Sequence, residues 1–80
     1  MEWNQQGCNV CRTAWERAVP TTAMNLLGTS YKLHCRLYQC RSCQSYWEEL
    51  ERFAHEIDQN EAMRLNQDSS FEPATSPRAL

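Results

Sequence analysis

The sequence predicts a small α+β domain that consists of a β-hairpin followed by a C-terminal helix. Two Cys-x-x-Cys pairs, an alternating apolar pattern over residues 31–38 and a helical apolar period after residue 45 lead to this prediction. With 80 residues, the chain has room for one domain. A core of this size supplies about 3–5 kcal/mol of net stability, so such a chain usually needs a disulfide, a metal ion or a partner.

Two closely spaced cysteine pairs predict a metal site. Cys8 and Cys11 form the first pair, and Cys40 and Cys43 form the second, with 28 residues between the pairs. Two intervening residues let a tight turn aim both sulfur atoms at one ion, and two such turns supply a tetrahedron of four thiolates. We therefore expect these four cysteines to bind one structural Zn²⁺, with each pair in a zinc knuckle.

The remaining cysteine and the histidine beside it are weaker ligand candidates. Residues 31–38 alternate with period two, which places Cys35 on the apolar face with Leu33 and Leu37, and His34 on the polar face. A free cysteine on an apolar face behaves as a small hydrophobic residue. We expect Cys35 to be buried without binding the metal and His34 to be exposed, with either side chain as an alternative ligand.

Composition and charge indicate the cellular compartment of the protein and the kinds of partner that it could attract. The net charge is −2 and the pI is about 5.6, so the chain as a whole does not attract nucleic acid or anionic lipid. The first residues contain no basic segment followed by an apolar run, and no apolar stretch approaches the roughly 20 residues that span a bilayer. We expect a cytoplasmic protein, in which clustered cysteines favour metal binding over disulfides.

Between the cysteine pairs, the pattern predicts a β-hairpin. Residues 13–19 are interpreted as a short strand that Pro20 ends, with a short helix as the alternative. Residues 21–28 are interpreted as a connection with one helical turn that Gly28 stops. Residues 31–39 form the second predicted strand, which leads directly into Cys40. We expect the two strands to pair antiparallel.

The segment after the second cysteine pair predicts a helix. Ser45 and Glu48 have the spacing of a capping box. Apolar residues then recur at helical spacing at Tyr46, Leu50, Phe53 and Ile57. The apolar phase shifts after this point, so the pattern fits either one continuous helix or a second short helix over about 59–66. Residues 67–80 have no apolar period, and we expect a domain of residues 1–66 followed by a disordered tail.

This order of elements, a knuckle, a hairpin and a second knuckle that leads into a helix, resembles the treble-clef zinc fold. The zinc ribbon is the alternative, in which the chain would continue as a strand through residues 44–47. The two cysteine turns are also similar to those of rubredoxins, which bind iron. However, Arg12 and Gln44 stand where rubredoxins and many knuckles place glycine. The resemblance covers residues 8 to about 57 and implies a metal site made of four cysteines.

A site made of four protein thiolates leaves no coordination position for water or substrate, so the predicted ion is structural. His34 and His55 lie on separate elements with no nucleophile motif nearby, and we expect neither enzymatic activity nor a small-molecule substrate. Segregated charges favour a protein–protein interaction module, such as an adaptor, an inhibitor, or an immunity or antitoxin-type protein that masks its partner. The candidate partner-binding residues are Lys32, Arg36, Tyr38, Glu48 and Glu49.

Nucleic-acid binding is the alternative function. On the polar strand face, Lys32 and Arg36 would contact phosphates and Tyr38 would stack on a base. The acidic residues between positions 48 and 61 and the negative net charge oppose this interpretation. Another protein is therefore the favoured partner. One-electron transfer by a rubredoxin-like iron site is a minor alternative.

Overall fold

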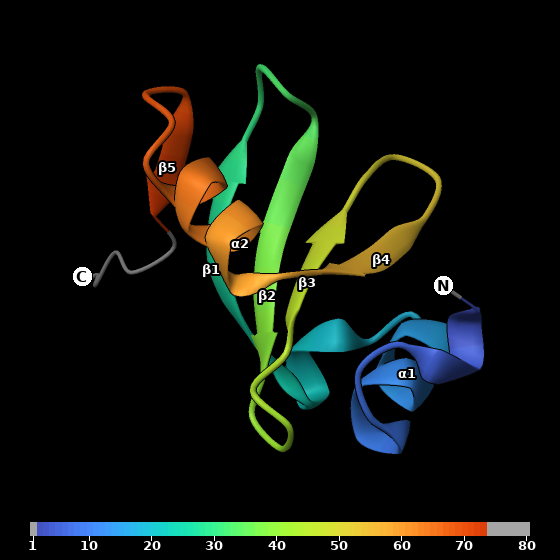
Figure 1. Ribbon diagram of the computed structural model, residues 1–80. Helices are drawn as coiled ribbons and strands as arrows, with labels where there is room; N and C mark the ends of the chain where they lie inside the picture. The colour runs from blue at the N-terminus through green and yellow to red at the C-terminus, as the bar shows by residue number, and fades with distance from the viewer. Residues whose placement is uncertain (1, 74–80) are drawn as a thin grey trace.

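In the computed structural model, which describes residues 2–73, one antiparallel sheet carries a helix on each face (Figure 1). The elements follow in the order η1 (Trp3–Gln5), α1 (Asn9–Glu16), η2 (Pro20–Thr22), β1 (Met24–Ser30), β2 (Cys35–Cys40), β3 (Tyr46–Glu49), β4 (Ala54–Ile57), α2 (Gln59–Asn66) and β5 (Phe71–Pro73). The strand order is β4-β3-β2-β1-β5, so β1 to β4 form a meander and β5 pairs with the outer edge of β1. This confirms a small α+β architecture.

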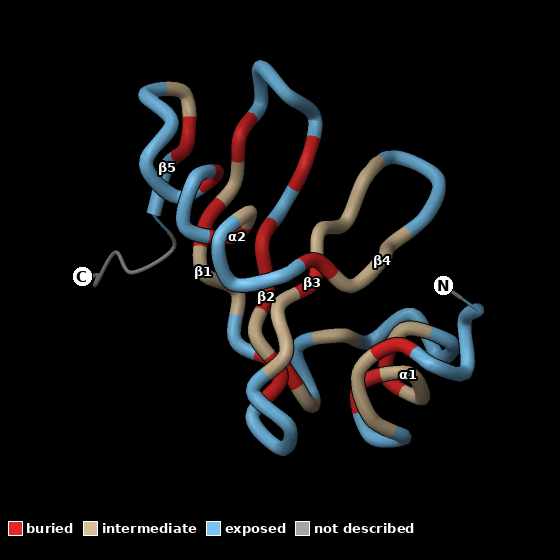
Figure 2. Tube along the Cα trace, viewed as in Figure 1, coloured by how far each residue is buried: buried red, intermediate tan, exposed pale blue. Residues whose placement is uncertain are grey.

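Figure 2 shows buried residues along the central strand β2. The two faces of this strand contribute to different hydrophobic clusters. The α1-side cluster consists of Cys11, Ala14, Met24, Tyr38, Cys40 and Trp47. The α2-side cluster consists of Cys35, Leu37, Ile57, Ala62, Leu65 and Phe71. Successive residues of a strand point to opposite faces, so Leu37 and Tyr38 enter different clusters.

The first helix lies where the pattern of residues 13–19 predicted a strand, and that prediction is wrong. α1 begins directly after Cys8, its N-cap, and buries Cys11 and Ala14. Since residues three apart share one face of a helix, the Cys-x-x-Cys spacing continues with Ala14 as a helical pattern. The chain leaves the helix through Ala18, whose φ of 59° lies in the left-handed region.

The predicted connection over residues 21–28 is in fact the start of the hairpin. Only Pro20–Thr22 forms a 3₁₀ turn, and β1 then pairs antiparallel with β2. Residues 31–34 form the turn between these strands, so the predicted alternation holds only from Cys35 onward. Tyr31 is 70% exposed and Leu33 is 41% exposed, whereas Tyr38, predicted on the polar face, is buried.

The helix predicted over residues 46–57 is wrong, and with it the capping box at Ser45. β3 pairs with β2 on one side and with β4 on the other, and residues 50–53 form the hairpin loop. Trp47 lies opposite Tyr38 on β2 and is fully buried. A strand that is covered on both faces carries apolar residues at successive positions, and these also satisfy a helical period.

The second short helix over about 59–66 is confirmed as α2. Asp58 is its N-cap, and its side chain accepts a hydrogen bond of 2.8 Å from the Glu61 N–H. Ala62 and Leu65 are buried against the sheet, and Met63 faces solvent. α2 follows β4 after a single residue and covers the face opposite α1.

The first part of the expected tail packs on the sheet. Phe71 is buried, and β5 pairs with β1 so that Phe71 lies opposite Ser30 and Pro73 lies opposite Gly28. A Cβ on Gly28 would stand 2.5 Å from the Phe71 ring, so the absence of a side chain makes room for this contact. Residues 74–80 of the expected tail lie outside the described residues.

A β-bulge interrupts β1 near its middle. Leu26 pairs with Tyr38 and Gly28 pairs with Leu37, so Leu27 is an extra residue on the β1 side. Leu26 packs against the α1-side cluster, whereas Leu27 packs against the α2-side cluster. One strand thus contributes side chains to both clusters at the bulge.

Candidate metal centre

The first cysteine pair is placed by the start of α1. Cys8 precedes the helix and Cys11 lies in its first turn, where the Cys8 N–H donates a hydrogen bond of 3.1 Å to the Cys11 Sγ. Gly7 has a φ of 55° and leads the chain into this turn. The Gly7 N–H donates to the Glu56 carboxylate at 2.8 Å, which fixes the turn to β4. This pair therefore belongs to a helix N-terminus and not to the predicted knuckle.

The second pair lies in the tight turn between β2 and β3. The Cys40 N–H donates to the Ser45 carbonyl at 2.9 Å, and the Gln44 N–H donates to the Cys40 carbonyl at 3.0 Å. Gln44 has a φ of 68°, so it occupies the left-handed position at which many knuckles have glycine. The turn leaves Cys40 buried and Cys43 exposed.

The four sulfur atoms come together between α1 and this turn. All lie within 4.8 Å of one another. The sulfur–sulfur distances are 3.7 Å for Cys8–Cys40, 3.8 Å for Cys8–Cys11 and 3.9 Å for Cys11–Cys43. These are far longer than the roughly 2.05 Å of a disulfide. They match the sulfur–sulfur edge of about 3.8 Å that follows from a tetrahedron with Zn–S distances of about 2.3 Å. The cluster can hold one metal ion.

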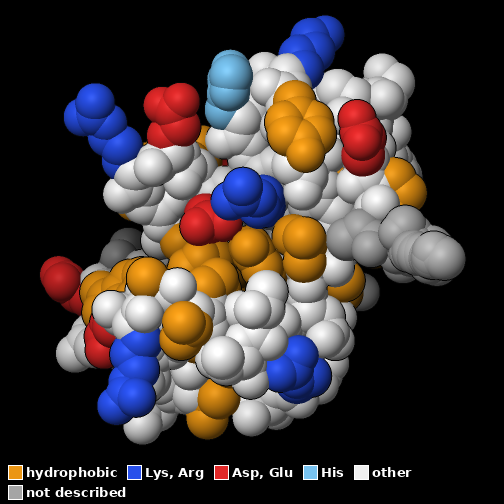
Figure 3. Space-filling view, turned by 180° about the vertical axis from the view of Figure 1, so that it is seen from behind, with side chains coloured by type: hydrophobic (Ala, Val, Ile, Leu, Met, Phe, Trp, Pro, Cys, Tyr) orange, Lys and Arg blue, Asp and Glu red, His pale blue; other side chains and the backbone are white. Residues whose placement is uncertain are grey.

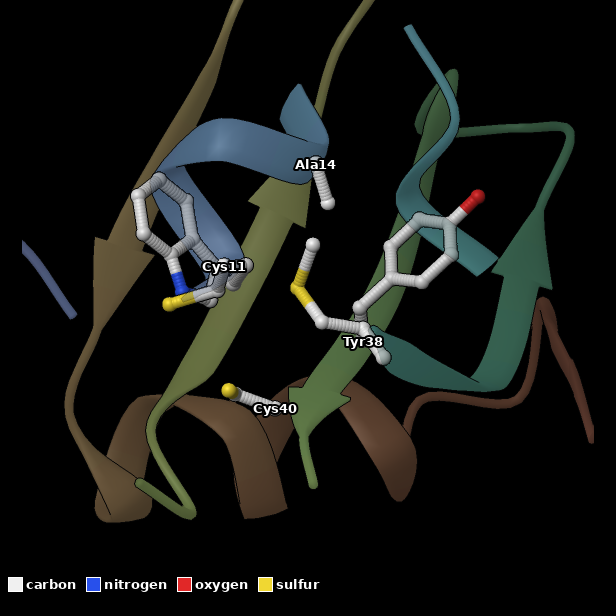
Figure 4. Close-up of a cluster of buried hydrophobic side chains, with 6 residues drawn as sticks. Cys11, Ala14, Tyr38 and Cys40 are labelled. Carbon is white, nitrogen blue, oxygen red and sulfur yellow. The ribbon is translucent and has the colours of Figure 1, made fainter. Parts of the chain in front are cut away.

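Figure 4 shows how two secondary-structure elements supply the buried half of this site. It shows Cys11 and Ala14 on α1 in the same buried cluster as Tyr38 and Cys40 on β2. The ligand candidates thus connect the N-terminal helix to the central strand of the sheet. A bound cation would link two cysteine pairs that the chain separates by 28 residues.

Hydrogen-bond donors surround the sulfur atoms. The Ser42 N–H donates to the Cys40 Sγ at 3.3 Å, and the Ser45 hydroxyl lies 2.9 Å from the Cys43 Sγ. Donors directed at sulfur stabilise a thiolate relative to a thiol. Ser45, which the sequence suggested as a helix cap, therefore contacts the site instead.

The indole N–H of Trp47 provides a further test of whether the site fits a cation held by thiolates. Trp47 is fully buried, and its Nε1 has no hydrogen-bond partner among residues 2–73. A Cβ on Gly7 would overlap the Cys11 Sγ and stand 3.0 Å from this Nε1, so both atoms border the same space. An anionic sulfur beside Trp47 would be a stronger acceptor than a neutral thiol. The residues present therefore fit a cation bound by four thiolates.

The thiols of the site differ in acidity. Burial raises the pKa of Cys11 to about 12, and burial also raises the pKa of Cys40. At Cys8, burial opposes ionisation, but hydrogen bonds from the Cys11 backbone and the Cys43 side chain outweigh it and lower the pKa to about 7. A metal ion must displace protons from the buried thiols, so metal uptake weakens as the pH falls.

Cys35 and His34 lie apart from the sulfur cluster. Cys35 is buried in the α2-side cluster, on the face of β2 opposite Cys40, and the four-cysteine group does not include it. Burial and the nearby Glu48 carboxylate raise the pKa of the Cys35 thiol, which keeps it neutral. His34 is exposed in the 31–34 turn with a φ of 57°.

Four of the five predicted partner-binding residues contact other side chains of this chain. Arg36 forms an ion pair of 3.1 Å with Glu49, and the buried Tyr38 donates its hydroxyl to the same carboxylate at 3.3 Å. Glu48 lies 2.9 Å from the Nε2 of His55 across β3 and β4. Only Lys32 stands free of these pairs, in the exposed turn.

Searches against protein-family models, curated proteins and solved structures found no match to this chain. The four-cysteine cluster stands on its own geometry, and no family match assigns the fold to the treble-clef or zinc-ribbon class. No helix within residues 2–73 is both long enough and apolar enough to cross a lipid bilayer.

Proposed function

We propose that this chain is a zinc-binding protein-interaction module in which one Zn²⁺ fastens α1 to the β2–β3 turn. The observation that carries this proposal is the convergence of four cysteine sulfurs within 4.8 Å of one another, with three of the distances at 3.7–3.9 Å, near the edge of a zinc–thiolate tetrahedron. With Cys8, Cys11, Cys40 and Cys43 as ligands, no coordination position is left for water or substrate. The ion therefore has a structural role, and the module is not an enzyme.

The ion supplies folding free energy, and the residues of the chain orient its ligands. Structural zinc contributes about 10–16 kcal/mol in zinc-finger peptides, several times the stability that a core of this size supplies. Gly7 allows the close approach of Trp47 and Cys11, and Ser42 and Ser45 direct donors at the sulfurs of the second pair. These contacts hold the thiolates in place around the cation.

Metal analysis of the purified chain tests the zinc assignment. We expect one zinc per chain by mass spectrometry, and a cobalt-substituted chain with the absorption bands of a tetrahedral thiolate site. A chain purified under metal-replete conditions with no stoichiometric metal would contradict the proposal. A red protein that contains iron would instead support a rubredoxin-like electron carrier.

The proposed partner is another protein, which the module binds and masks as an adaptor, an inhibitor or an immunity-type protein would. Large hydrophobic side chains are exposed at Trp3, Val10, Val19, Tyr31, Leu33, Phe53 and Met63. Aromatic side chains at the surface favour protein interfaces. Isolation of the native complex, followed by titration of the purified partner with the zinc-loaded chain, tests this role. A chain that stays monomeric and without a partner under native purification argues against it.

Nucleic-acid binding has less support because Tyr38 is buried and cannot stack on a base. Lys32 and Arg36 remain exposed, but Arg36 is paired with Glu49. An electrophoretic shift of an oligonucleotide at about 50 mM salt, lost at higher salt, would revive this function.

A further inference from the structure

A groove of about 510 Å³ opens between the N-terminal arm (residues 3–20) and the β3–β4 hairpin (residues 49–54). The side chains that matter for its chemistry are Trp3, Trp15 and Glu16 on the arm, and Glu49, Glu51 and Phe53 on the hairpin. Figure 3, which views the molecule from behind, shows exposed hydrophobic side chains in a hollowed band, with acidic and basic side chains beside them. The groove lies outside the metal site.

Three aromatic side chains line the groove. Phe53 is 60% exposed and Trp3 is 36% exposed, so both rings are accessible to a ligand. Trp15 is half-buried and packs edge-on against Tyr38, with ring centroids 5.1 Å apart. The faces of tryptophan and phenylalanine rings attract cations because the π electrons give each ring face a negative electrostatic potential. The lining therefore offers contacts to an alkyl chain that ends in a positive charge.

The groove carries mainly negative charges, which would attract a positively charged ligand. Its lining contains three carboxylates and the guanidinium of Arg52. Glu49 is already paired with Arg36, but neither Glu16 nor Glu51 forms an ion pair within the part of the chain that the structure describes. The Trp3 Nε1 donates to the Glu16 carboxylate at 2.8 Å, which holds this acid beside an aromatic ring. Two carboxylates thus remain available to a cationic ligand.

We propose that this groove binds an exposed segment of a partner protein in which a lysine or arginine is flanked by apolar residues. The inference rests on the proposed interaction function and names the kind of partner. The alkyl part of the basic side chain would lie on Trp3 and Phe53, and its charge would lie near Glu16 and Glu51. A phosphate backbone does not fit, since these carboxylates would repel it.

The metal site and the groove share helix α1, which carries both Cys11 and Trp15. Trp15 lies one helical turn after Cys11 on α1, and it also packs against Trp47, with ring centroids 5.8 Å apart. A zinc ion that fastens Cys11 to the sheet therefore fixes the position of Trp15 relative to the hairpin. Peptide binding is expected only from the zinc-loaded chain.

A peptide titration followed by ¹⁵N–¹H NMR tests the groove. The probe is a short peptide with arginine between two leucines, and the control is the same peptide with citrulline, which keeps the shape and removes the charge. We expect shifts of the Trp3 and Trp15 indole signals and of residues 49–54. The citrulline peptide should bind about three- to tenfold more weakly. Equal binding of the two peptides, or shifts confined to other residues, would overturn the inference.

Matched substitutions separate the groove from general surface effects. Phe53→Ala and the pair Glu16→Gln with Glu51→Gln should each weaken binding of the arginine peptide at least about threefold. Met63→Ala on α2 and Glu72→Gln on β5 remove an exposed hydrophobic side chain and an exposed charge outside the groove, and should leave peptide binding unchanged. Unchanged binding by the groove variants would refute the assignment.

Further readouts on the same samples distinguish the possible failures. A folded chain with one zinc and no peptide shift overturns this inference and leaves the zinc-binding module intact. A chain without zinc overturns the proposed function itself. Groove shifts that appear on raising the protein concentration without peptide identify a second copy as the occupant. Groove shifts caused by an oligonucleotide identify a nucleic acid. Either of these results would replace the basic segment as ligand.

Discussion

The two faces of the sheet are covered by helices of eight residues each that are held in different ways. α2 follows β4 after one residue, is capped by Asp58, and buries Ala62 and Leu65 in the α2-side cluster. α1 buries Cys11 and Ala14, and Cys11 is a candidate metal ligand. An alanine and a cysteine bury little apolar area, and the half-buried Trp15 adds contacts with Tyr38 and Trp47. The comparison teaches that α2 is held by hydrophobic burial, whereas α1 combines the packing of Trp15 with a candidate ligand of the sulfur cluster.

Removal of one buried sulfur should have the largest effect on the α1 side. Cys40→Ser should abolish stoichiometric zinc and unfold the α1 side, because the binding free energy of the ion is also folding free energy. Zinc content and loss of near-ultraviolet circular dichroism from the tryptophans measure the effect. A strong chelator should reproduce it in the native chain. Retention of full zinc by the variant would exclude Cys40 as a ligand.

A truncation on the other face should reduce stability without releasing the metal. Leu37 is 1% exposed in the α2-side cluster, so Leu37→Ala should lower the free energy of unfolding by about 3 kcal/mol. Urea unfolding in the presence of zinc gives the stability change, and the zinc content of the folded variant should stay near one per chain. If this variant loses zinc while folded, the two faces are not independent.

A backbone change beside the sulfur cluster should have a smaller effect on the α1 side alone. Gly7→Ala places a methyl group in a left-handed residue and against the Cys11 Sγ and the Trp47 ring. The backbone term is about 1–2 kcal/mol, and displacement of Cys11 should weaken zinc affinity about tenfold. Competition with a chromogenic chelator measures the affinity. An affinity equal to that of the native chain would show that the turn adapts.

The smallest effect is expected at the cysteine outside the cluster. Cys35→Val keeps an apolar side chain of similar size in the α2-side cluster, so we expect full zinc content and a stability change within about 1.5 kcal/mol. The same zinc and urea measurements apply. Loss of zinc from this variant, together with its retention after Cys43→Ser, would show that Cys35 is a ligand.

Local spacing predicted the sulfur cluster well and the sheet poorly. The two Cys-x-x-Cys pairs specify a site by their own geometry, and the structure brings all four together. The segment after Cys43 is different, because Tyr46 and Trp47 are both apolar and enter opposite faces of a strand. Such a strand has no alternation, and the spacing from Tyr46 to Ile57 also satisfies a helix. Its pairing with β2 and β4 depends on residues that are distant in the sequence.

The other errors have equally specific causes. The first cysteine pair was interpreted as a knuckle, although Cys11 and Ala14 already continue a helical spacing with Cys8 as N-cap. Phe71 was assigned to a tail because its own neighbourhood is polar. It is buried in the α2-side cluster, and the missing side chain of Gly28 leaves room for its ring. No local pattern around residue 71 indicates that Gly28, more than forty residues earlier, leaves space for the Phe71 ring.

The bulge at Leu27 has a consequence for how β1 tolerates changes of length. Leu26 and Gly28 already pair with neighbouring residues of β2, so deletion of Leu27 would leave every pairing between β1 and β2 in place. The deletion would remove only a side chain from the α2-side cluster. Deletion at any other site within β1 would shift the pairing and turn side chains to the wrong face. The strand thus contains one position at which the chain can shorten without losing its alignment.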